Sequence, residues 1–208
     1  MRLFWLIFLP AAAYQLMAIF AEIRHAWLRH RLRKQSKPFR PGISVLKPLR
    51  GSDRGMYRAF VSQVRQNYPV FEVLFGVSSM DDPAALEVKR LQRAFPKAPI
   101  HLIAGCSEAA NPKVGVLENL SRYAKYPILL VNDGDIKVGP DYLESVVSPL
   151  ADPRIGIVTC PYRPHPQSAA TAWEAIGIAT DFIPSTLAAP FAGVREFGLG
   201  STLVFRAI

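Results

Sequence analysis

The sequence predicts an α/β protein in which helices cover both faces of an open, mostly parallel β-sheet, preceded by one N-terminal transmembrane helix. Two observations support this fold class. From Ile43 onward, short apolar runs alternate with amphipathic stretches, as in chains that pass repeatedly from strand to helix. Before them, residues 3–21 carry no charge over 19 positions, which is close to the length of a helix that crosses a bilayer.

The uncharged run is predicted to be an uncleaved membrane anchor. Only Arg2 precedes it, whereas a secretory signal has its basic residues first. The rival interpretation, a secreted protein cleaved after the small residues at 11–13, is therefore less favoured. By the positive-inside rule, the chain is expected to cross the membrane once and to keep its globular part in the cytosol. The basic residues that follow the run are Arg24, Arg29, Arg31, Arg33, Lys34, Lys37 and Arg40.

The net charge of +9 comes from this basic run and not from the folded body. From residue 41 onward the chain has 17 Lys and Arg against 15 Asp and Glu. A local basic cluster suits the anionic headgroups of a lipid bilayer, and the absence of interleaved aromatic residues argues against nucleic-acid binding. We therefore predict an anchor over residues 1–23, a basic juxtamembrane linker over 24–41 and a globular domain over 42–208.

Within the globular domain, predicted strands and helices take turns along the chain. The strands are predicted at 43–49, 71–78, 100–105, 127–132, 155–160 and 201–205, and the helices at 54–66, 83–95 and 114–124. In sheets of this kind, ligands bind beyond the carboxyl ends of the strands. Polar clusters follow three of these ends, at residues 47–53, 80–82 and 132–135. These clusters form the candidate site.

The candidate site centres on Asp133 and Asp135, which follow a predicted strand in the sequence VNDGD. In an extended segment their side chains point the same way, because side-chain direction repeats every two residues. Two neighbouring carboxylates suit a hard divalent cation, Mn²⁺ or Mg²⁺, that also holds diphosphate oxygens. The alternative is a turn without a ligand, since Asn, Asp and Gly all favour turns.

The remaining clusters allow more than one interpretation. Asp82 precedes a proline at a predicted helix start, so it either caps that helix or accepts hydrogen bonds from a base or a ribose. Lys47 is a candidate counter-charge for phosphates, although the spacing of a phosphate-binding loop is absent. Lys113, in the sequence NPKVG, is a loop lysine beside a helix start, for which a structural role is the alternative.

In their order and spacing, these motifs resemble the ceramide glucosyltransferase family, which includes bacterial relatives that glycosylate hopanoids or other lipids. The resemblance covers about residues 40–206 together with the anchor arrangement, and it rests on ISVLKPLRGSD, NYPVFEVLFGVSSMDDPA, NPKV, VNDGDIKVGPDYL, GIVTCPYR and GSTLVFR. It implies a GT-A nucleotide-sugar-binding fold. It also implies inverting transfer of a hexose, typically glucose, from a UDP-sugar to a membrane-lipid hydroxyl.

The resemblance further implies roles for individual residues. Asp82 matches the acidic position expected near uracil and ribose. Asp133 and Asp135 match the metal-binding aspartates beside the diphosphate, and Asp133 is also expected to contact the nucleotide-sugar. The other positions expected near the nucleotide-sugar are Lys47, Asp53 and Lys113.

Two departures from the family pattern bear on activity. Gly115 and Val116 stand where the family usually has two asparagines, which removes two polar side chains near the site. The family also continues past GSTLVFR with an acidic residue that acts as the base, so here the base is expected beyond Ile208 and the catalytic residue is unknown. The chain is accordingly expected to be C-terminally truncated. Two functions stay open: a lipid hexosyltransferase, or a non-catalytic membrane protein that retains at most nucleotide-sugar binding.

Overall fold

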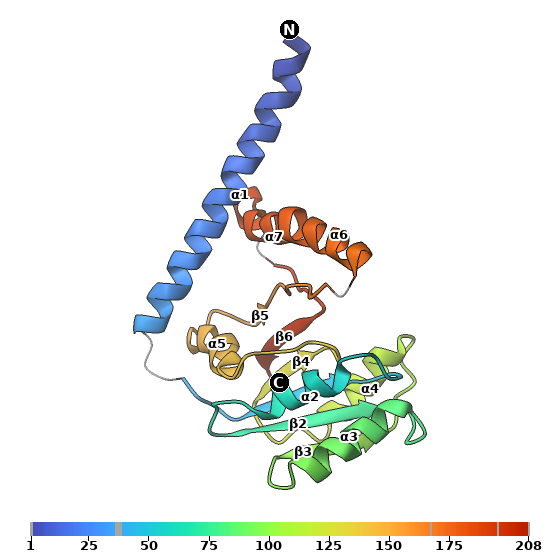
Figure 1. The fold of residues 1–208 in the computed structure, drawn as a ribbon. Helices are drawn as coiled ribbons and strands as arrows, with labels where there is room; N and C mark the ends of the chain where they lie inside the picture. Colours follow the sequence, from blue (N-terminus) through green and yellow to red (C-terminus); the bar gives the residue numbers. More distant parts are fainter. Residues whose placement is uncertain (1, 36–38, 167, 195, 208) are drawn as a thin grey trace. The chain divides into compact units, whose positions relative to one another are not determined.

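The computed structural model describes residues 2–35, 39–166, 168–194 and 196–207 (Figure 1). The chain forms two compact units. The sheet unit comprises residues 38–160 and 198–208, and the helical unit comprises residues 1–37 and 161–197.

The sheet unit alternates strands and helices, as predicted (Figure 1). Its strands are β1 (Ile43–Pro48), β2 (Phe71–Val77), β3 (Ile100–Ala104), β4 (Ile128–Asn132), β5 (Ile157–Thr159) and β6 (Thr202–Arg206). Its helices are α2 (Met56–Val64), α3 (Pro83–Ala94), α4 (Pro112–Ser121), α5 (Tyr142–Val147) and the 3-10 helix η1 (Ser148–Ala151). Helices α5 and η1 are not among the predicted helices, because such short helices show no clear helical period.

The strands follow the order β3-β2-β1-β4-β6-β5. Strands β1 to β4 pair in parallel, whereas β6 runs antiparallel to both of its neighbours. The predicted α/β class with a mostly parallel sheet is therefore confirmed. From β1 the chain moves outward to β3 and then returns to the other side of β1 as β4. The ends of β1 and β4 consequently mark the topological switch point, where sheets of this kind bind ligands.

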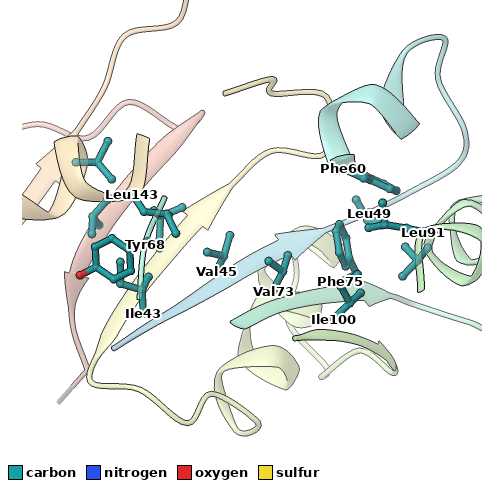
Figure 2. Packing of buried hydrophobic residues seen from close by; sticks show 14 of the residues in the cluster. Ile43, Val45, Leu49, Phe60, Tyr68, Val73, Phe75, Leu91, Ile100 and Leu143 are labelled. Atoms are coloured by element: carbon teal, nitrogen blue, oxygen red, sulfur yellow. The ribbon is translucent and has the colours of Figure 1, made fainter. Parts of the chain in front are cut away.

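Side chains that alternate along the strands divide the core into two layers. On one face, the cluster in Figure 2 joins the strands to α2, α3 and α5. In this cluster the ring centroids of Phe60 on α2 and Phe75 on β2 are 4.7 Å apart. On the other face, Val116 and Leu120 of α4 pack against the buried strand residues Leu46, Leu74, Leu129 and Val131. Helices thus cover both faces of the sheet, as predicted.

The helical unit contains α1 (Arg2–Gln35) and a segment inserted between β5 and β6. This inserted segment, Ala169–Ala192, consists of α6 (Ala169–Gly177), the π-helix η2 (Ile178–Phe182), α7 (Ile183–Ala188) and the 3-10 helix η3 (Ala189–Ala192). Helix α7 packs against α1. These helices are not among the predicted ones. The segment contains Gly177, Pro184 and Pro190, which are residue types that disfavour helix interiors.

The boundaries of the units differ from the expected segments. Helix α1 continues through Gln35, so most of the expected linker over residues 24–41 is helical. Part of that linker, residues 36–38, lies outside the described residues. Residues 161–197 group with α1 and not with the sheet. Two stretches have the length and hydropathy of a membrane span, Ile7–Leu28 and Ala169–Ala192, where one was expected.

Gly76 offers a test of the packing between β2 and α4. A Cβ atom at this position would lie 2.6 Å from Cγ1 of Val116 and 2.8 Å from Cδ1 of Leu120. Both neighbours belong to the packed core, so we expect Gly76→Ala to lower the free energy of unfolding by about 1–3 kcal/mol. Urea unfolding of the full chain in detergent micelles, followed by far-UV circular dichroism, measures the change.

The matched control is Gly139→Ala, because no atom lies within 4 Å of the Cβ added there. We expect this variant to unfold at nearly the same urea concentration as the natural chain. Equal midpoints for Gly76→Ala and Gly139→Ala would show that α4 does not constrain β2 as described.

Candidate functional site

Two of the polar loops predicted to form the site meet at the carboxyl edge of the sheet. Strands β1, β2 and β4 are parallel and adjacent, so the loops that follow them share this edge. The amide of Gly51 donates hydrogen bonds of 2.9 and 3.2 Å to the two carboxylate oxygens of Asp82. The loop after β1 is thereby tied to the loop after β2.

The start of α4 reaches the same edge through an ion pair. Nζ of Lys113 lies 2.5 Å from Oδ1 of Asp133, which directly follows β4. Asn111 caps α4 by accepting a hydrogen bond of 2.9 Å from the Lys113 amide, which fixes the helix start. Two residues expected near the nucleotide-sugar, Lys113 and Asp133, are therefore in direct contact.

The acidic pair lies on a turn. Strand β4 ends at Asn132, and the amide of Ile136 donates a hydrogen bond of 3.3 Å to the carbonyl of Asp133. This differs from the extended geometry expected for Asp133 and Asp135, because the chain turns immediately after the strand. Gly134 suits the tight space of this turn, since a Cβ there would lie 3.0 Å from Cδ2 of Leu49.

A buried polar network lies beneath the turn and centres on Asn132. Neither Lys47 nor Asn132 has exposed surface. Nζ of Lys47 donates to Oδ1 of Asn132 and to the carbonyl of Asp133, both at 2.6 Å. Oδ1 of Asn132 also accepts from Nε2 of Gln63 at 2.8 Å, and its Nδ2 donates to Oγ1 of Thr202 at 3.1 Å. The network thus connects β1, α2, β4 and β6.

Burial determines the protonation of Lys47. Because its amine is removed from water, the pKa of Lys47 is lowered from 10.5 to about 7. The carboxylates of Asp135 and Asp133 oppose this change by favouring the charged form, so both lie within electrostatic reach of the amine. Lys47 was expected to be a counter-charge for phosphates. Its amine instead faces the protein interior and supports the acidic turn from within.

The two carboxylates of the turn differ in their contacts. Asp133 is partly buried and pairs with Lys113, whose side chain is 44% exposed. Asp135 is exposed, and within the described part of the chain its carboxylate has no hydrogen-bond or ion-pair partner. The carboxylate of Asp135 is therefore unpaired within the described part of the chain, and the carboxylate of Asp133 is held by a lysine at the protein surface.

The donor set fits a divalent cation that is shared with a phosphate ligand. The described residues contain no group of three or more His, Cys, Asp and Glu side chains that could hold a metal ion by themselves. Mg²⁺ in phosphate-binding sites usually takes one or two carboxylates and completes its coordination with phosphate oxygens and water. Asp133 and Asp135 provide such a partial set.

Asp82 has a structural role that the sequence analysis had considered. Its Oδ1 accepts a hydrogen bond of 2.9 Å from the amide of Ala84 and so caps α3. The additional contact with Gly51 places the loop after β1 beside the helix start. Asp53 lies exposed in that loop, and its carbonyl accepts from the amide of Met56 at the start of α2.

Sequence reasoning missed Gln63 and Thr202 as supports of the site. One signal for Gln63 was present: it lies on the buried stripe of α2 at helical spacing from Met56, Ala59 and Phe60. A polar residue on such a stripe requires a buried partner. Thr202 shows no comparable signal, because its partner Asn132 is 70 positions away.

Gly115 and Val116, which stand where the resembled family usually has two asparagines, are packed residues of α4. Both residues are buried, and Val116 lies in the core beneath the sheet. A Cβ at Gly115 would lie 2.5 Å from Sγ of Cys106 and 2.8 Å from the carbonyl oxygen of Ser107. An asparagine would not fit at Gly115 without a shift of the loop after β3.

A shallow hollow also lies near the amino ends of β2 and β3. It contains none of the predicted site residues, and its polar lining residues include Glu72, Gln92, His101, Tyr123 and Lys125. Glu72 is buried and is already held by Ser44 at 2.7 Å and by the Lys125 amide at 2.8 Å. The carboxyl edge, where the predicted residues meet, is therefore the better candidate.

Comparisons with known proteins match the chain to a family of glycosyltransferases. A family model described as glycosyl transferase family 21 matches residues 3–207. The ceramide glucosyltransferase 1 of Caenorhabditis elegans is 31% identical over 170 residues, which cover 80% of this chain and 36% of that protein. The ceramide glucosyltransferase of Komagataella phaffii is 30% identical over 102 residues, which cover 47% of this chain and 20% of that protein. This chain thus spans 36% or less of the length of these relatives.

A solved structure shares the fold. The mannosyltransferase PcManGT of Pyrobaculum calidifontis, solved in complex with GDP-Man and Mn²⁺, superposes with a TM-score of 0.60 and 22% sequence identity. The superposition covers 94% of this chain and 55% of that protein. At this level of identity the likeness establishes a glycosyltransferase fold of the GT-A type, as predicted.

Burial of Lys47 predicts a pH-dependent stability. The pKa of Lys47 in the folded chain is about 7, below its ordinary 10.5, so between these values the unfolded chain holds a proton that the folded chain has released. The free energy of unfolding should therefore rise as the pH increases from 7 to 9. We expect Lys47→Met to flatten this rise in urea titrations of the full chain.

The control is Lys137→Met, which removes an exposed lysine from the loop that follows the turn. This variant should keep the pH dependence of the natural chain. If Lys47→Met and Lys137→Met show the same dependence, the amine of Lys47 is not buried as described.

The ion pair between Lys113 and Asp133 predicts competition with a cation. In the absence of nucleotide, we expect Lys113→Met to bind Mn²⁺ roughly 2- to 5-fold more tightly, because an exposed ion pair worth about 0.4–1 kcal/mol no longer occupies Asp133. Electron paramagnetic resonance of free Mn²⁺ measures the affinity. The exposed Lys97→Met serves as the control, and an equal or weaker affinity of Lys113→Met would contradict the competition.

Proposed function

Because the chain belongs to glycosyl transferase family 21, we propose that it binds a UDP-sugar together with Mn²⁺ or Mg²⁺ and acts in the inverting transfer of a hexose to a membrane lipid. Relatives named ceramide glucosyltransferase support glucose as the sugar and a ceramide-like lipid as the acceptor, with a hopanoid as the alternative. The observation that carries the proposal is the acidic turn of Asp133 and Asp135 at the switch point of the sheet.

In the proposed complex, the nucleotide lies along the carboxyl edge of the sheet. Asp133 and Asp135 would hold the cation, which would neutralise the diphosphate and stabilise it as a leaving group. Lys113, once displaced from Asp133 by the cation, becomes a positive side chain for the phosphates. Its surface position and its contact with the turn support this role.

The base and the ribose would lie beside the loops after β1 and β2. The carboxylate of Asp82 holds Gly51 and caps α3, so it orders both loops before a ligand arrives. Asp53 is exposed in the loop after β1 and is available to accept hydrogen bonds from the nucleotide. Lys47 is proposed to act indirectly, because its amine holds the turn from the interior.

The proposed chemistry is a single displacement. The hydroxyl oxygen of the lipid attacks the anomeric carbon on the face opposite the diphosphate, and the bond from that carbon to the diphosphate oxygen breaks. The nucleoside diphosphate leaves with the bonding electrons, so the configuration of the sugar inverts. The hydroxyl proton passes to a carboxylate base.

We propose that α1 is the membrane anchor. Its apolar stretch Ile7–Leu28 has 22 residues and, at about 1.5 Å per residue, matches a hydrocarbon core of about 30 Å. Near its basic end, the guanidinium carbon of Arg31 lies 5.2 Å from the ring centroid of Trp27. Such a pair suits the bilayer surface, and the basic residues beyond it favour the cytosolic side for the sheet unit.

Loss of the free carboxylate tests the metal site directly. We expect Asp135→Asn to weaken binding of UDP-glucose in the presence of Mn²⁺ by about 10-fold or more, because a charged ligand of the cation is replaced by a neutral one. Isothermal titration calorimetry of the full chain in detergent, with Mn²⁺ or with EDTA, measures the loss. Asp81→Asn is the matched control, since Asp81 is exposed beside Asp82 and, among the described residues, forms hydrogen bonds only within its own loop.

Transfer to a short-chain ceramide in the same preparation separates the two functions. Glucosylated product from the natural chain, absent with Asp135→Asn, supports the transferase. Metal-dependent binding without any product favours a nucleotide-sugar-binding protein. Binding that survives Asp135→Asn unchanged would reduce the acidic pair to a structural turn.

A further inference from the structure

We propose that the inserted segment Ala169–Ala192 is an interfacial membrane helix that lies in one leaflet of the bilayer beside α1 and does not cross it. The partner of this surface is the bilayer itself. The inference depends on α1 lying in a membrane and not on glycosyl transfer.

The first observation is the exposure of apolar side chains on α6. Trp173 is 79% exposed and Ile176 is 56% exposed, and α6 has no buried residue. With Ala169 they occupy positions i, i+4 and i+7, which form one face of the helix. The whole segment has a mean hydropathy of 1.3, equal to that of the candidate span in α1. Contiguous exposed apolar surface of this kind marks an interaction site.

The second observation is the distribution of charge. The segment contains two charged residues, Glu174 and Asp181, both of them exposed. On α6, Glu174 follows Trp173 directly, so it lies about 100° around the helix axis from that side chain. A helix with one apolar face and a charged face beside it lies in the plane of a bilayer surface, with its apolar side chains reaching about 5–10 Å inward.

The third observation is the contact between α7 and α1. Ala18 and Ala21 on α1 and Ala188 on α7 are each only 3% exposed where these helices pack. Small residues that allow close approach are typical of helix contacts in membranes. Just beyond them, the ring of Phe191 lies 5.7 Å from that of Phe20 and 5.4 Å from the guanidinium carbon of Arg24.

The position along α1 of its contact with α7 indicates how deeply the inserted segment lies in the bilayer. Ala18 to Arg24 lie in the later part of the candidate span Ile7–Leu28, on the side where the basic residues follow. Arg24 favours the headgroup region, whereas Phe20 lies one turn deeper. The end of the inserted segment therefore meets α1 near the basic surface of the bilayer.

Strand pairing excludes a complete crossing. Strands β5 and β6 pair directly, with Thr159 opposite Leu203, so both ends of the insertion return to the same sheet. If the 24-residue segment crossed the bilayer, one of its two connections to the sheet, residues 160–168 or 193–201, would have to recross it. Nine fully extended residues reach at most about 32 Å, less than the thickness of about 40–45 Å of a bilayer with its headgroup regions. Irregular backbone would also leave its polar groups unpaired in lipid.

The connection between this segment and the candidate site is short along the chain. Eight residues, 193–200, separate Ala192 from Ser201, whose carbonyl accepts a hydrogen bond of 3.3 Å from the amide of Asp133. A membrane-bound segment at this place gives the chain a second attachment to the bilayer, close in sequence to Ser201, whose carbonyl contacts the acidic turn.

Depth-dependent quenching of Trp173 tests the inference. The full chain with Trp5→Phe and Trp27→Phe keeps Trp173 as its single tryptophan. It is reconstituted into vesicles of phosphatidylcholine and phosphatidylglycerol that carry bromine atoms either near the headgroups or near the ends of the acyl chains. We expect the shallow bromines to quench Trp173 about twofold more strongly than the deep ones, and acrylamide to quench it weakly.

A matched variant moves the tryptophan to the charged face through Trp173→Phe and Glu174→Trp in the same background. Its emission should be quenched more by acrylamide and less by the shallow bromines. Strong acrylamide quenching of Trp173 without any effect of bromine would overturn the proposal in favour of a water-facing helix. Strongest quenching by the deep bromines would overturn it in favour of a crossing helix. Binding of UDP-glucose by the same vesicles reports on the donor site independently.

Discussion

The buried amine of Lys47 is the group on which the candidate site depends. A polar group without exposed surface is unfavourable unless partners surround it, and here the partners are the side chain of Asn132 and the carbonyl of Asp133. Because Asn132 also holds Gln63 and Thr202, four elements are joined at one point. The turn above it is therefore ordered by buried contacts, which leaves the exposed carboxylate of Asp135 for a ligand.

The order of the strands explains why these groups meet. With β1 between β2 and β4, the loops that follow three parallel strands converge at the switch point. Strand β6 reaches the same edge from the opposite direction, so its first residue, Thr202, contacts Asn132. The carbonyl of Ser201 likewise accepts from the amide of Asp133. An antiparallel strand thus completes a site that is otherwise typical of parallel sheets.

The helical unit combines features that a water-facing protein would avoid. It exposes Trp173 and Ile176, and it buries small residues of α1 where α7 packs. Hydropathy alone would make the inserted segment a second membrane span. The pairing of β5 with β6 argues against a second span, because both ends of the segment return to one sheet through connections of nine residues that are too short to recross the bilayer. A lipid surface then accounts for the exposed side chains and for the charges at Glu174 and Asp181.

The sequence by itself determined the fold class and indicated the location of the candidate site, because strand and helix periods are local and polar residues after parallel strands share one edge. It also indicated Asp82, Lys113 and Asp133 as residues of the candidate site. Only the tertiary structure decided that Lys47 is interior, since its partner Asn132 lies 85 positions away. It also decided that the acidic pair forms a turn and that residues 161–197 group with α1. Each of these depends on contacts between distant segments, which no local pattern records.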